Sequence, residues 1–224
     1  MNNKKYKAFI SYSHSDEAWA KRLHKALETY SIPKRLVGQI AEHGAIPKRL
    51  SPIFRDREEL PSATDLGQKV DAALEQSSAL IVICSPDAAR SRWVNEEILA
   101  FKRLGRSDRI FSLIVGGEPH ASDHPGQESE ECFPEALRFE LDADGSLSTR
   151  PAEPIAADAR SGKDGRYNAK LKLISGLLGV GFDELRQREQ VRRHRRMAVI
   201  TAASLIGMVI ATALAATAWL ARAE

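Results

Sequence analysis

A tryptophan and a glutamate lie one helical turn apart, just after the most apolar short run of the N-terminal part of the chain. Ala79 to Cys84 is rich in β-branched residues, which predicts a strand buried on both faces of a sheet. Trp93 and Glu97 follow in a segment of helical periodicity, so both side chains are expected on one apolar face. Two interpretations are open. Glu97 lies at the solvent edge of that face, or it is a functional carboxylate beside an aromatic wall.

Polar residues also follow the first predicted strand. Ser11, Tyr12 and Ser13 come directly after its apolar residues, and Ser85 comes directly after the buried strand. Strands alternate with helices, which predicts an α/β fold with a doubly wound, parallel, five-stranded sheet of the flavodoxin-like order 2-1-3-4-5. In that order a ligand crevice opens outside the carboxyl ends of the first and third strands. The hydroxyls can line such a crevice, or Ser13 and Ser15 can simply cap the next helix.

The other elements follow from apolar periodicity and breaker residues. Further helices are predicted at residues 19–30, 65–74 and 167–178, and further strands at residues 52–54 and 109–115. Asp16 or Ser15 is expected to cap the first helix. The fifth strand is expected within residues 133–141, and residues 142–165 are expected to form a loop. From Phe182 onward the sequence predicts one helix.

Composition and motifs exclude several classes of function. The chain has 224 residues, of which 43% are hydrophobic, and a formal net charge of +3. No GxGxxG follows the first strand and no GxxxxGK[ST] occurs, so the nucleotide sites that these motifs form are not predicted. Cys84 and Cys132 lack CxxC spacing, and His120 and His124 lie between prolines, so no metal site is predicted. The basic residues are concentrated in one segment, so no nucleic-acid partner is expected.

The C-terminal part of the chain has a different composition. Six arginines crowd residues 186–196, and Met197 to Leu220 contains no charged residue. About 20 predominantly apolar residues suffice to cross a bilayer, so the sequence predicts a transmembrane helix there. The arginines before the span predict a cytoplasmic N-terminal domain at the cell inner membrane. The predicted organisation is a domain over residues 1–180, a basic juxtamembrane helix over 181–196 and the membrane helix over 197–220.

Three short motifs mark the first hundred residues. They are Phe9-Ile10-Ser11-Tyr12-Ser13 at the first strand, Phe54-Arg55-Asp56 before a charged loop, and Ser91-Arg92-Trp93-Val94-Asn95-Glu96-Glu97-Ile98 after the third strand. With these motifs in this order, the chain from about Lys4 to Leu178 resembles the Toll/interleukin-1 receptor (TIR) domain, and most closely its bacterial members. The resemblance implies the flavodoxin-like fold given above.

The resemblance also implies an enzyme that cleaves NAD between nicotinamide and ribose, with NAD as substrate and with no cofactor or metal. In catalytic TIR domains a glutamate four residues after a tryptophan, on the helix that follows the third strand, carries the reaction. That position is Glu97 here, and Trp93 is expected to form a flat wall of the site. One carboxylate can suffice because nicotinamide leaves as a neutral molecule, unlike the leaving groups of ordinary glycosides. Glu96 is the rival carboxylate.

The same resemblance implies how the substrate is held. Ser11, Tyr12 and Ser13 are expected to line the cleft. Arg55 and Asp56 are expected to lie at its mouth, where a guanidinium suits a diphosphate.

Two functions are open on this basis. The first is a membrane-anchored NAD hydrolase or ADP-ribosyl cyclase in bacterial antiviral or stress signalling. The second is a noncatalytic TIR adaptor that mediates self-association and signalling at the membrane. In both cases other TIR domains are expected partners in a homo-oligomer, and the charged loop from Arg55 to Leu60 is expected to carry the contacts.

Overall fold

The computed structural model describes residues 4–55 and 66–220. The chain divides into two compact units, Met1–Phe182 and Asp183–Glu224. The first unit contains a five-stranded sheet with helices on both faces. The described part of the second belongs to helix α7 (Phe182–Leu220), whose first residue lies in the first unit. All the residues of the candidate site lie in the first unit.

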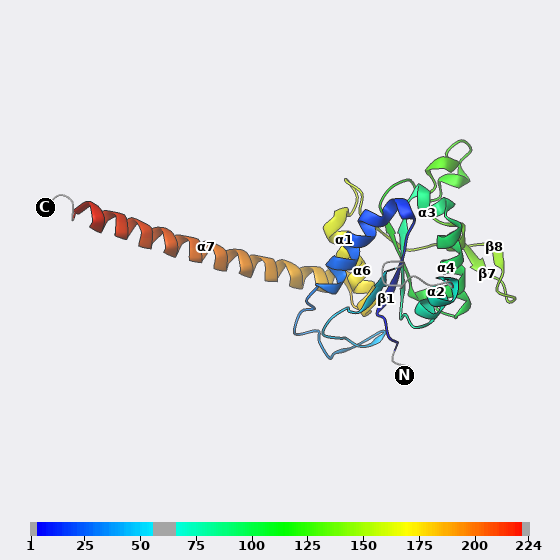
Figure 1. Ribbon diagram of the computed structural model, residues 1–224, viewed down its shortest axis with the longest axis horizontal. Helices are drawn as coiled ribbons and strands as arrows, with labels where there is room; N and C mark the ends of the chain where they lie inside the picture. Colours follow the sequence, from blue (N-terminus) through cyan, green and yellow to red (C-terminus); the bar gives the residue numbers. More distant parts are fainter. Residues whose placement is uncertain (1–3, 56–65, 221–224) are drawn as a thin grey trace. The chain divides into compact units, whose positions relative to one another are not determined.

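A parallel sheet forms the centre of the first unit (Figure 1). In spatial order its strands are β4 (Ile53–Arg55), β1 (Ala8–Ser11), β5 (Leu80–Cys84), β6 (Ile110–Ile114) and β9 (Ala156–Asp158). All neighbouring pairs are parallel. Counted along the chain, these strands lie in the order 2-1-3-4-5, so the predicted sheet order is confirmed. The carboxyl ends of β1 and β5 therefore lie side by side at the point where the strand order reverses.

The two central strands are apolar because both of their faces are covered. All residues of β5 are completely buried, as are Phe9 and Ile10 of β1. Full burial of one such aliphatic or aromatic side chain contributes about 1.5–3 kcal/mol relative to an exposed one. Residues at the ends of β1 and β5 are therefore attached to the most tightly held part of the fold.

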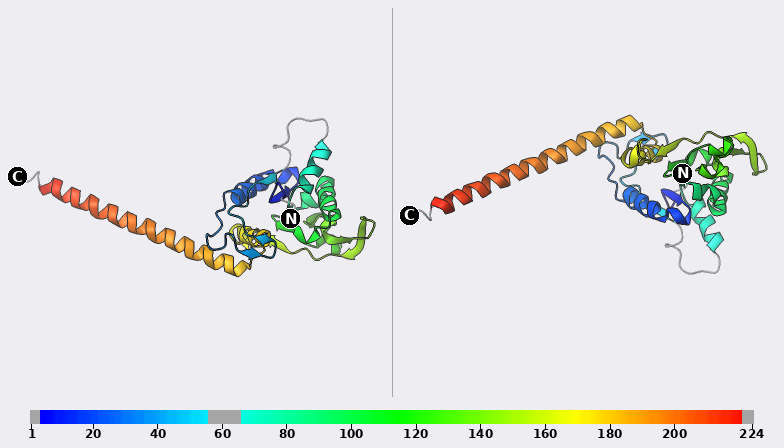
Figure 2. Two further views of the ribbon diagram at one scale, coloured as in Figure 1. Left: turned by 90° about the horizontal axis from the view of Figure 1, so that it is seen from below. Right: turned by 90° about the horizontal axis from the view of Figure 1, so that it is seen from above.

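Helices cover both faces of this sheet (Figures 1 and 2). Helices α1 and α6 pack together on one face, and α2 and α4 pack together on the other. The helices of the first unit are α1 (Glu17–Glu28), α2 (Leu66–Glu75), α3 (Pro86–Arg90), α4 (Arg92–Arg103), α5 (Glu135–Arg138) and α6 (Gly165–Leu178). Short 3-10 turns occupy His14–Asp16, Ser107–Arg109, Ala121–Asp123 and Glu128–Glu130. Gly179 follows the last residue of α6 and caps the helix, and its φ of 65° is left-handed and favours glycine.

The fifth strand of the sheet is not where the sequence predicted it. Phe139–Leu141 is strand β7, but it pairs antiparallel with β8 (Leu147–Pro151) in a separate small sheet. The strand that completes the main sheet is β9, which lies inside the stretch expected to be a loop and pairs with β6. A strand of three residues is too short to show a periodic pattern of apolar residues in the sequence. Of the three residues of β9, only Ala157 is buried. A further hairpin pairs β2 (Ile40–Ala41) with β3 (Gly44–Ala45).

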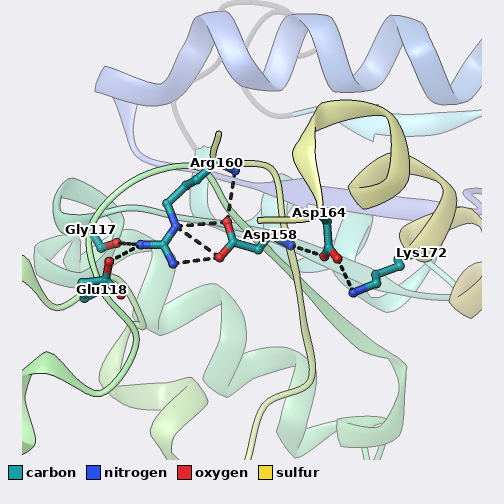
Figure 3. A network of polar contacts seen from close by, with 6 residues as sticks. All are labelled: Gly117, Glu118, Asp158, Arg160, Asp164 and Lys172. Carbon is teal, nitrogen blue, oxygen red and sulfur yellow. Dashed lines mark hydrogen bonds and ion pairs between the residues drawn. The ribbon is translucent and has the colours of Figure 1, made fainter. Parts of the chain in front are cut away.

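A network of charged side chains holds β9 in place (Figure 3). The guanidinium of Arg160 donates to both carboxylate oxygens of Asp158, with Nη2 2.7 Å from Oδ2 and Nε 3.0 Å from Oδ1. Its Nη1 donates to Glu118 Oε1 at 2.6 Å and to the carbonyl of Gly117. Asp164, at the start of α6, accepts from the backbone N–H of Asp158 at 3.0 Å. The network joins the end of β9 to the loop after β6 and to α6.

The predicted membrane helix is not supported. Of the helices formed by residues 4–55 and 66–220, none combines the length and apolar character that crossing a membrane requires. The predicted span from Met197 to Leu220 and the inner-membrane location are therefore contradicted, and the membrane as a partner is not supported. The prediction rested on the absence of charge, but more than half of that run is Ala, Gly, Ser or Thr, which are small or carry a hydroxyl. Ala, Gly, Ser and Thr add little to the free energy of insertion that Leu, Ile, Val and Phe side chains supply, so absence of charge alone does not establish a span.

Removing the guanidinium of Arg160 should destabilise the first unit. In Arg160→Ala we expect the free energy of unfolding to fall by about 2–3 kcal/mol, because Asp158 is left without its charged partner. Both side chains are only 17% exposed, so solvent screens the pair weakly. Arg150→Ala is the matched control, because Arg150 is 62% exposed and pairs with exposed Glu140 and Asp142. Such surface pairs contribute about 0–1 kcal/mol. Urea unfolding followed by circular dichroism compares the two variants, and equal losses would contradict this role.

The contribution of this ion pair should depend on pH. Burial alone would raise the pKa of Asp158, but hydrogen bonds and charge from Arg160 outweigh burial and lower that pKa. A carboxyl group whose pKa is lowered by folding stabilises the fold above its unfolded pKa of about 3.9, and this stabilisation is lost as the pH falls through the folded pKa. The difference in unfolding free energy between the parent and Arg160→Ala should be complete at neutral pH and shrink below about pH 4. A difference that stays constant under acid conditions would exclude an electrostatic origin.

Candidate functional site

Two serine caps set the position of the helix that carries Glu97. The chain leaves β5 at Ser85, whose hydroxyl accepts a hydrogen bond from a backbone N–H of α3 at 3.0 Å. Ser91 caps α4 in the same way, at 3.4 Å. Each cap satisfies a backbone donor that the helix itself leaves unpaired. The caps thus start α4 at Arg92, which places Trp93 in its first turn and Glu97 in its second.

A cleft of about 530 Å3 lies between α2 and α4. Trp93 and Glu97 both line it. Trp93 is 65% exposed and forms an open wall, whereas Glu97 is only 8% exposed. Glu97 therefore does not lie at the solvent edge of the apolar face of its helix. The remaining lining residues are Gly67, Val70, Asp71, Leu74, Glu75, Glu96, Ala100, Arg103 and Leu104. The volume is within the range of about 300–1,000 Å3 typical of small-molecule sites.

The cleft carries an excess of negative charge. Asp71 and Glu75 of α2 and Glu96 and Glu97 of α4 line it, whereas Arg103 is the one cation among the described lining residues. A cleft with lining of one sign attracts groups of the opposite charge. This lining therefore favours a ligand whose inserted part is cationic.

The carboxylate of Glu97 is hydrogen-bonded to the central sheet. The hydroxyl of Ser11, at the end of β1, donates to Glu97 Oε2 at 2.5 Å, and Ser11 is completely buried. Ser11 pairs in register with Val82 of β5, the strand that α3 and then α4 follow in the chain. The structure thus brings together Ser11 and Glu97, which lie 86 residues apart in the sequence.

A second buried carboxylate lies at the same edge of the sheet. Asp16 Oδ2 accepts hydrogen bonds from the hydroxyls of Ser13 at 2.8 Å and Ser85 at 2.6 Å, and all three residues are buried. Asp16 stands at the N-cap of α1, as predicted, but its side chain makes no capping hydrogen bond. This cluster was not predicted from the sequence, because Ser85 lies 69 residues from Asp16 and such a distant partner leaves no local signal. The cluster ties the turn after β1 to the turn after β5.

The other predicted substrate-binding residues are distributed around this edge. Tyr12 is half-buried directly after β1. Arg55 is the last residue of β4, is 9% exposed and pairs in register with Ile10. Neither Tyr12, Ser13 nor Arg55 is among the residues that line the cleft between α2 and α4. Asp56 lies outside the described residues, as does most of the loop from Arg55 to Leu60.

No metal centre is found in the part of the chain that the structure describes, where no three His, Cys, Asp or Glu side chains are grouped to hold an ion. Cys84 and Cys132 are free thiols buried in one apolar cluster. Burial raises the pKa of the Cys132 thiol to about 12 and raises the pKa of Cys84 well above its ordinary value. Both thiols are protonated at neutral pH, and protonated thiols are poor nucleophiles.

Comparison with known proteins points to one family. A family model described as "TIR domain" matches residues 8–131, which extends from β1 past α4 and includes both Ser11 and Glu97. A relative from Actinoplanes sp., the "NAD(+) hydrolase ApTIR", is 30% identical over 227 aligned positions that span 94% of this chain. The chain covers 29% of the length of that relative.

A solved structure is also similar in part. It carries the description "Structure of the activated Roq1 resistosome directly recognizing the pathogen effector XopQ (TIR domains)". The match has 18% identity and a TM-score of 0.35, and it covers 49% of this chain and 57% of that chain. At this level the structural likeness adds nothing to the match with the family model.

Loss of the Asp16 carboxylate should destabilise the fold. In Asp16→Ala the hydroxyls of Ser13 and Ser85 lose a buried acceptor, and we expect the free energy of unfolding to fall by about 2–4 kcal/mol. Asp87→Ala is the matched control, because Asp87 is 51% exposed and pairs with exposed Arg90 on the surface of α3. We expect the control to lose less than about 1 kcal/mol. Urea unfolding measures both, and a loss in Asp16→Ala no larger than in the control would show that the cluster does not hold the two turns together.

Proposed function

This chain belongs to the TIR domain family, and we propose that it cleaves NAD between nicotinamide and ribose with Glu97 as the catalytic carboxylate. One observation supports this most directly. Glu97 is a nearly buried carboxylate that lines a cleft of ligand size beside the indole of Trp93. The relative named as an NAD(+) hydrolase supports NAD as the substrate.

The reaction needs a carboxylate and no strong acid. The bond between C1′ of the ribose and the pyridinium nitrogen breaks, and its electron pair goes to the ring, so nicotinamide leaves as a neutral molecule. Positive charge develops on the ribose as in other glycosyl transfers, which otherwise use a second carboxyl group to protonate the leaving group. The Glu97 carboxylate would stabilise that charge, and its low exposure strengthens the interaction. Attack by water then gives ADP-ribose, and attack by a nucleophile of the same molecule gives a cyclic product.

The lining of the cleft suits the nicotinamide end of NAD. The pyridinium ring is cationic before cleavage, and Asp71 and Glu75 of α2 add negative charge to the lining around it. The exposed face of Trp93 offers a cation–π contact to the same ring. After cleavage the ring is neutral, so these attractions weaken and the product is released more readily.

The opposite end of the substrate requires donors rather than carboxylates. Arg55 ends the strand next to β1, and a guanidinium binds a diphosphate through paired hydrogen bonds. We propose that Arg55 lies near the diphosphate end, and that Tyr12 and Ser13 contact the part of the substrate between the two ends. Asp56, which lies outside the described residues, stays a prediction from the sequence at the mouth of the cleft. The proposal uses no metal and no cofactor.

Glu96 is a weaker candidate for the catalytic carboxylate. Its side chain is 56% exposed and accepts a hydrogen bond from Arg92 Nε at 3.1 Å, one turn earlier on the same helix. An exposed carboxylate acts in nearly bulk dielectric, where its stabilisation of a developing cation is small. The difference in burial between these two neighbours favours Glu97.

Self-association and signalling stay predictions from the sequence. Of the loop from Arg55 to Leu60 that was expected to carry the contacts, only Arg55 is among the described residues, and it is buried. The expected role in antiviral or stress signalling likewise rests on the resemblance alone. An assembly that completes the active site is compatible with the enzyme proposed above.

Replacement of the Glu97 carboxylate by an amide should abolish most of the activity. In Glu97→Gln the side chain keeps its size and an acceptor for Ser11, but it loses the negative charge. We expect nicotinamide release to fall by about 10²–10³-fold, the range for loss of one electrostatic stabiliser of a transition state. The full 224-residue chain is incubated with NAD at high protein concentration, and free nicotinamide, ADP-ribose and cyclic products are separated chromatographically.

Glu96→Gln is the matched control, since it removes the same charge from the adjacent position. We expect its rate to stay within about threefold of the parent, because the side chain is exposed. Loss of activity in Glu96→Gln with full activity in Glu97→Gln would move the site to the neighbour. Absence of nicotinamide release from the parent chain at every protein concentration would favour the noncatalytic adaptor.

A further inference from the structure

We propose that Ser11 is a positioning residue that fixes Glu97 and keeps it ionised, rather than a residue that contacts the substrate. The inference rests on the proposed catalytic role of Glu97. Its starting observation is the 2.5 Å hydrogen bond from the Ser11 hydroxyl to Glu97 Oε2. That distance lies in the range of about 2.5–2.7 Å expected for a hydroxyl that donates to a charged carboxylate.

Burial argues against a direct contact between Ser11 and the substrate. Ser11 has no exposed surface and is not among the residues that line the cleft, whereas Glu97 is. A ligand in the cleft therefore reaches the carboxylate without reaching the hydroxyl behind it. Ser11 can influence the reaction only through Glu97.

The strand that carries Ser11 makes it a rigid anchor. β1 is paired on one side with β4 and on the other with β5, so its backbone is fixed by both neighbours. Serine has a single side-chain torsion before its hydroxyl, whereas glutamate has three torsions before its carboxylate. A bond from the fixed hydroxyl to Oε2 restricts those three torsions, and catalytic groups must be held within about 0.5 Å of the productive geometry.

The charges around Glu97 explain why such a donor is needed. Asp71 and Glu75 face the cleft from α2 and Glu96 faces it from α4, and like charges favour the protonated form of a carboxyl group. Arg103 of α4 lies in the same lining, and its positive charge acts in the opposite direction. Arg55 is the charged residue at the end of β4, on the far side of β1 from β5. A hydrogen bond donated to the ionised form favours that form. The Ser11 hydroxyl therefore offsets the acidic surroundings that attract the cationic ring.

The test compares NAD cleavage by the full chain and by variants of Ser11. Ser11→Ala removes the donor, and Ser11→Thr keeps a hydroxyl at the same position. Ser11→Cys keeps the shape of the site with a much weaker donor, so it carries the test if Ser11→Ala is poorly folded. The matched control is Ser112→Ala, because Ser112 is 1% exposed in β6, which is separated from β1 by β5.

We expect Ser11→Ala and Ser11→Cys to lower kcat about 10- to 100-fold with KM within about threefold. The acid limb of the pH–activity profile should move to higher pH by about one unit in both. A change that is merely structural would not shift the profile in this way. Ser11→Thr should recover most of the activity, and Ser112→Ala should match the parent in kcat and in pH profile.

Other outcomes overturn the proposal. A rise in KM with unchanged kcat and pH profile would make Ser11 a substrate contact, and parent-like kinetics in Ser11→Ala and Ser11→Cys would leave Ser11 without a role. A carbon NMR titration of the Glu97 carboxyl, assigned with Glu97→Gln, separates this inference from the proposed function. If the parent chain releases no nicotinamide, the proposed function fails. In that case the NMR titration of the Glu97 carboxyl still tests the role of Ser11. A titration midpoint that moves to higher pH in Ser11→Ala supports the role, and an unchanged midpoint contradicts it.

Discussion

The hydrogen bond between Ser11 and Glu97 connects the two parts of the fold that matter most for the site. Ser11 ends β1, which lies beside the central strand β5, and Glu97 lies on the helix α4 that packs against β5. A carboxylate on the inner face of a helix is unfavourable unless a donor meets it there. The parallel pairing of β1 with β5 places that donor, and so allows a nearly buried acid to face a cleft.

The same edge of the sheet is held by two further polar groups. Asp16 joins the turns after β1 and β5 through two serine hydroxyls, and Arg160 joins the ends of β6 and β9. Between them these contacts fix the loops that follow four of the five strands. A reaction that depends on the position of one carboxylate requires such rigid surroundings, because a misplacement of about 1 Å can lower the rate about 100-fold.

Much of the fold follows from local patterns in the sequence, and the exceptions have physical causes. The alternation of apolar strands with helices predicted the sheet order, and the helical spacing of Trp93 and Glu97 predicted a carboxylate on an apolar face. The strand β9 was not predicted because it is held by pairing with β6 and by long-range contacts of Arg160, and its own sequence has no periodic pattern. Asp16 was expected to cap a helix, since its distant partner Ser85 leaves no local signal. The membrane prediction was wrong because it treated absence of charge as sufficient.

The most direct test of a catalytic role for Glu97 is the structure of the full chain carrying Glu97→Gln with uncleaved NAD bound. We expect the nicotinamide ring to lie against the face of Trp93 in the cleft between α2 and α4. We also expect the adjoining ribose within hydrogen-bond distance, about 2.7–3.2 Å, of the side chain at position 97. NAD bound at a different surface, or bound in the cleft with its ribose beyond reach of position 97, would contradict a catalytic role for Glu97.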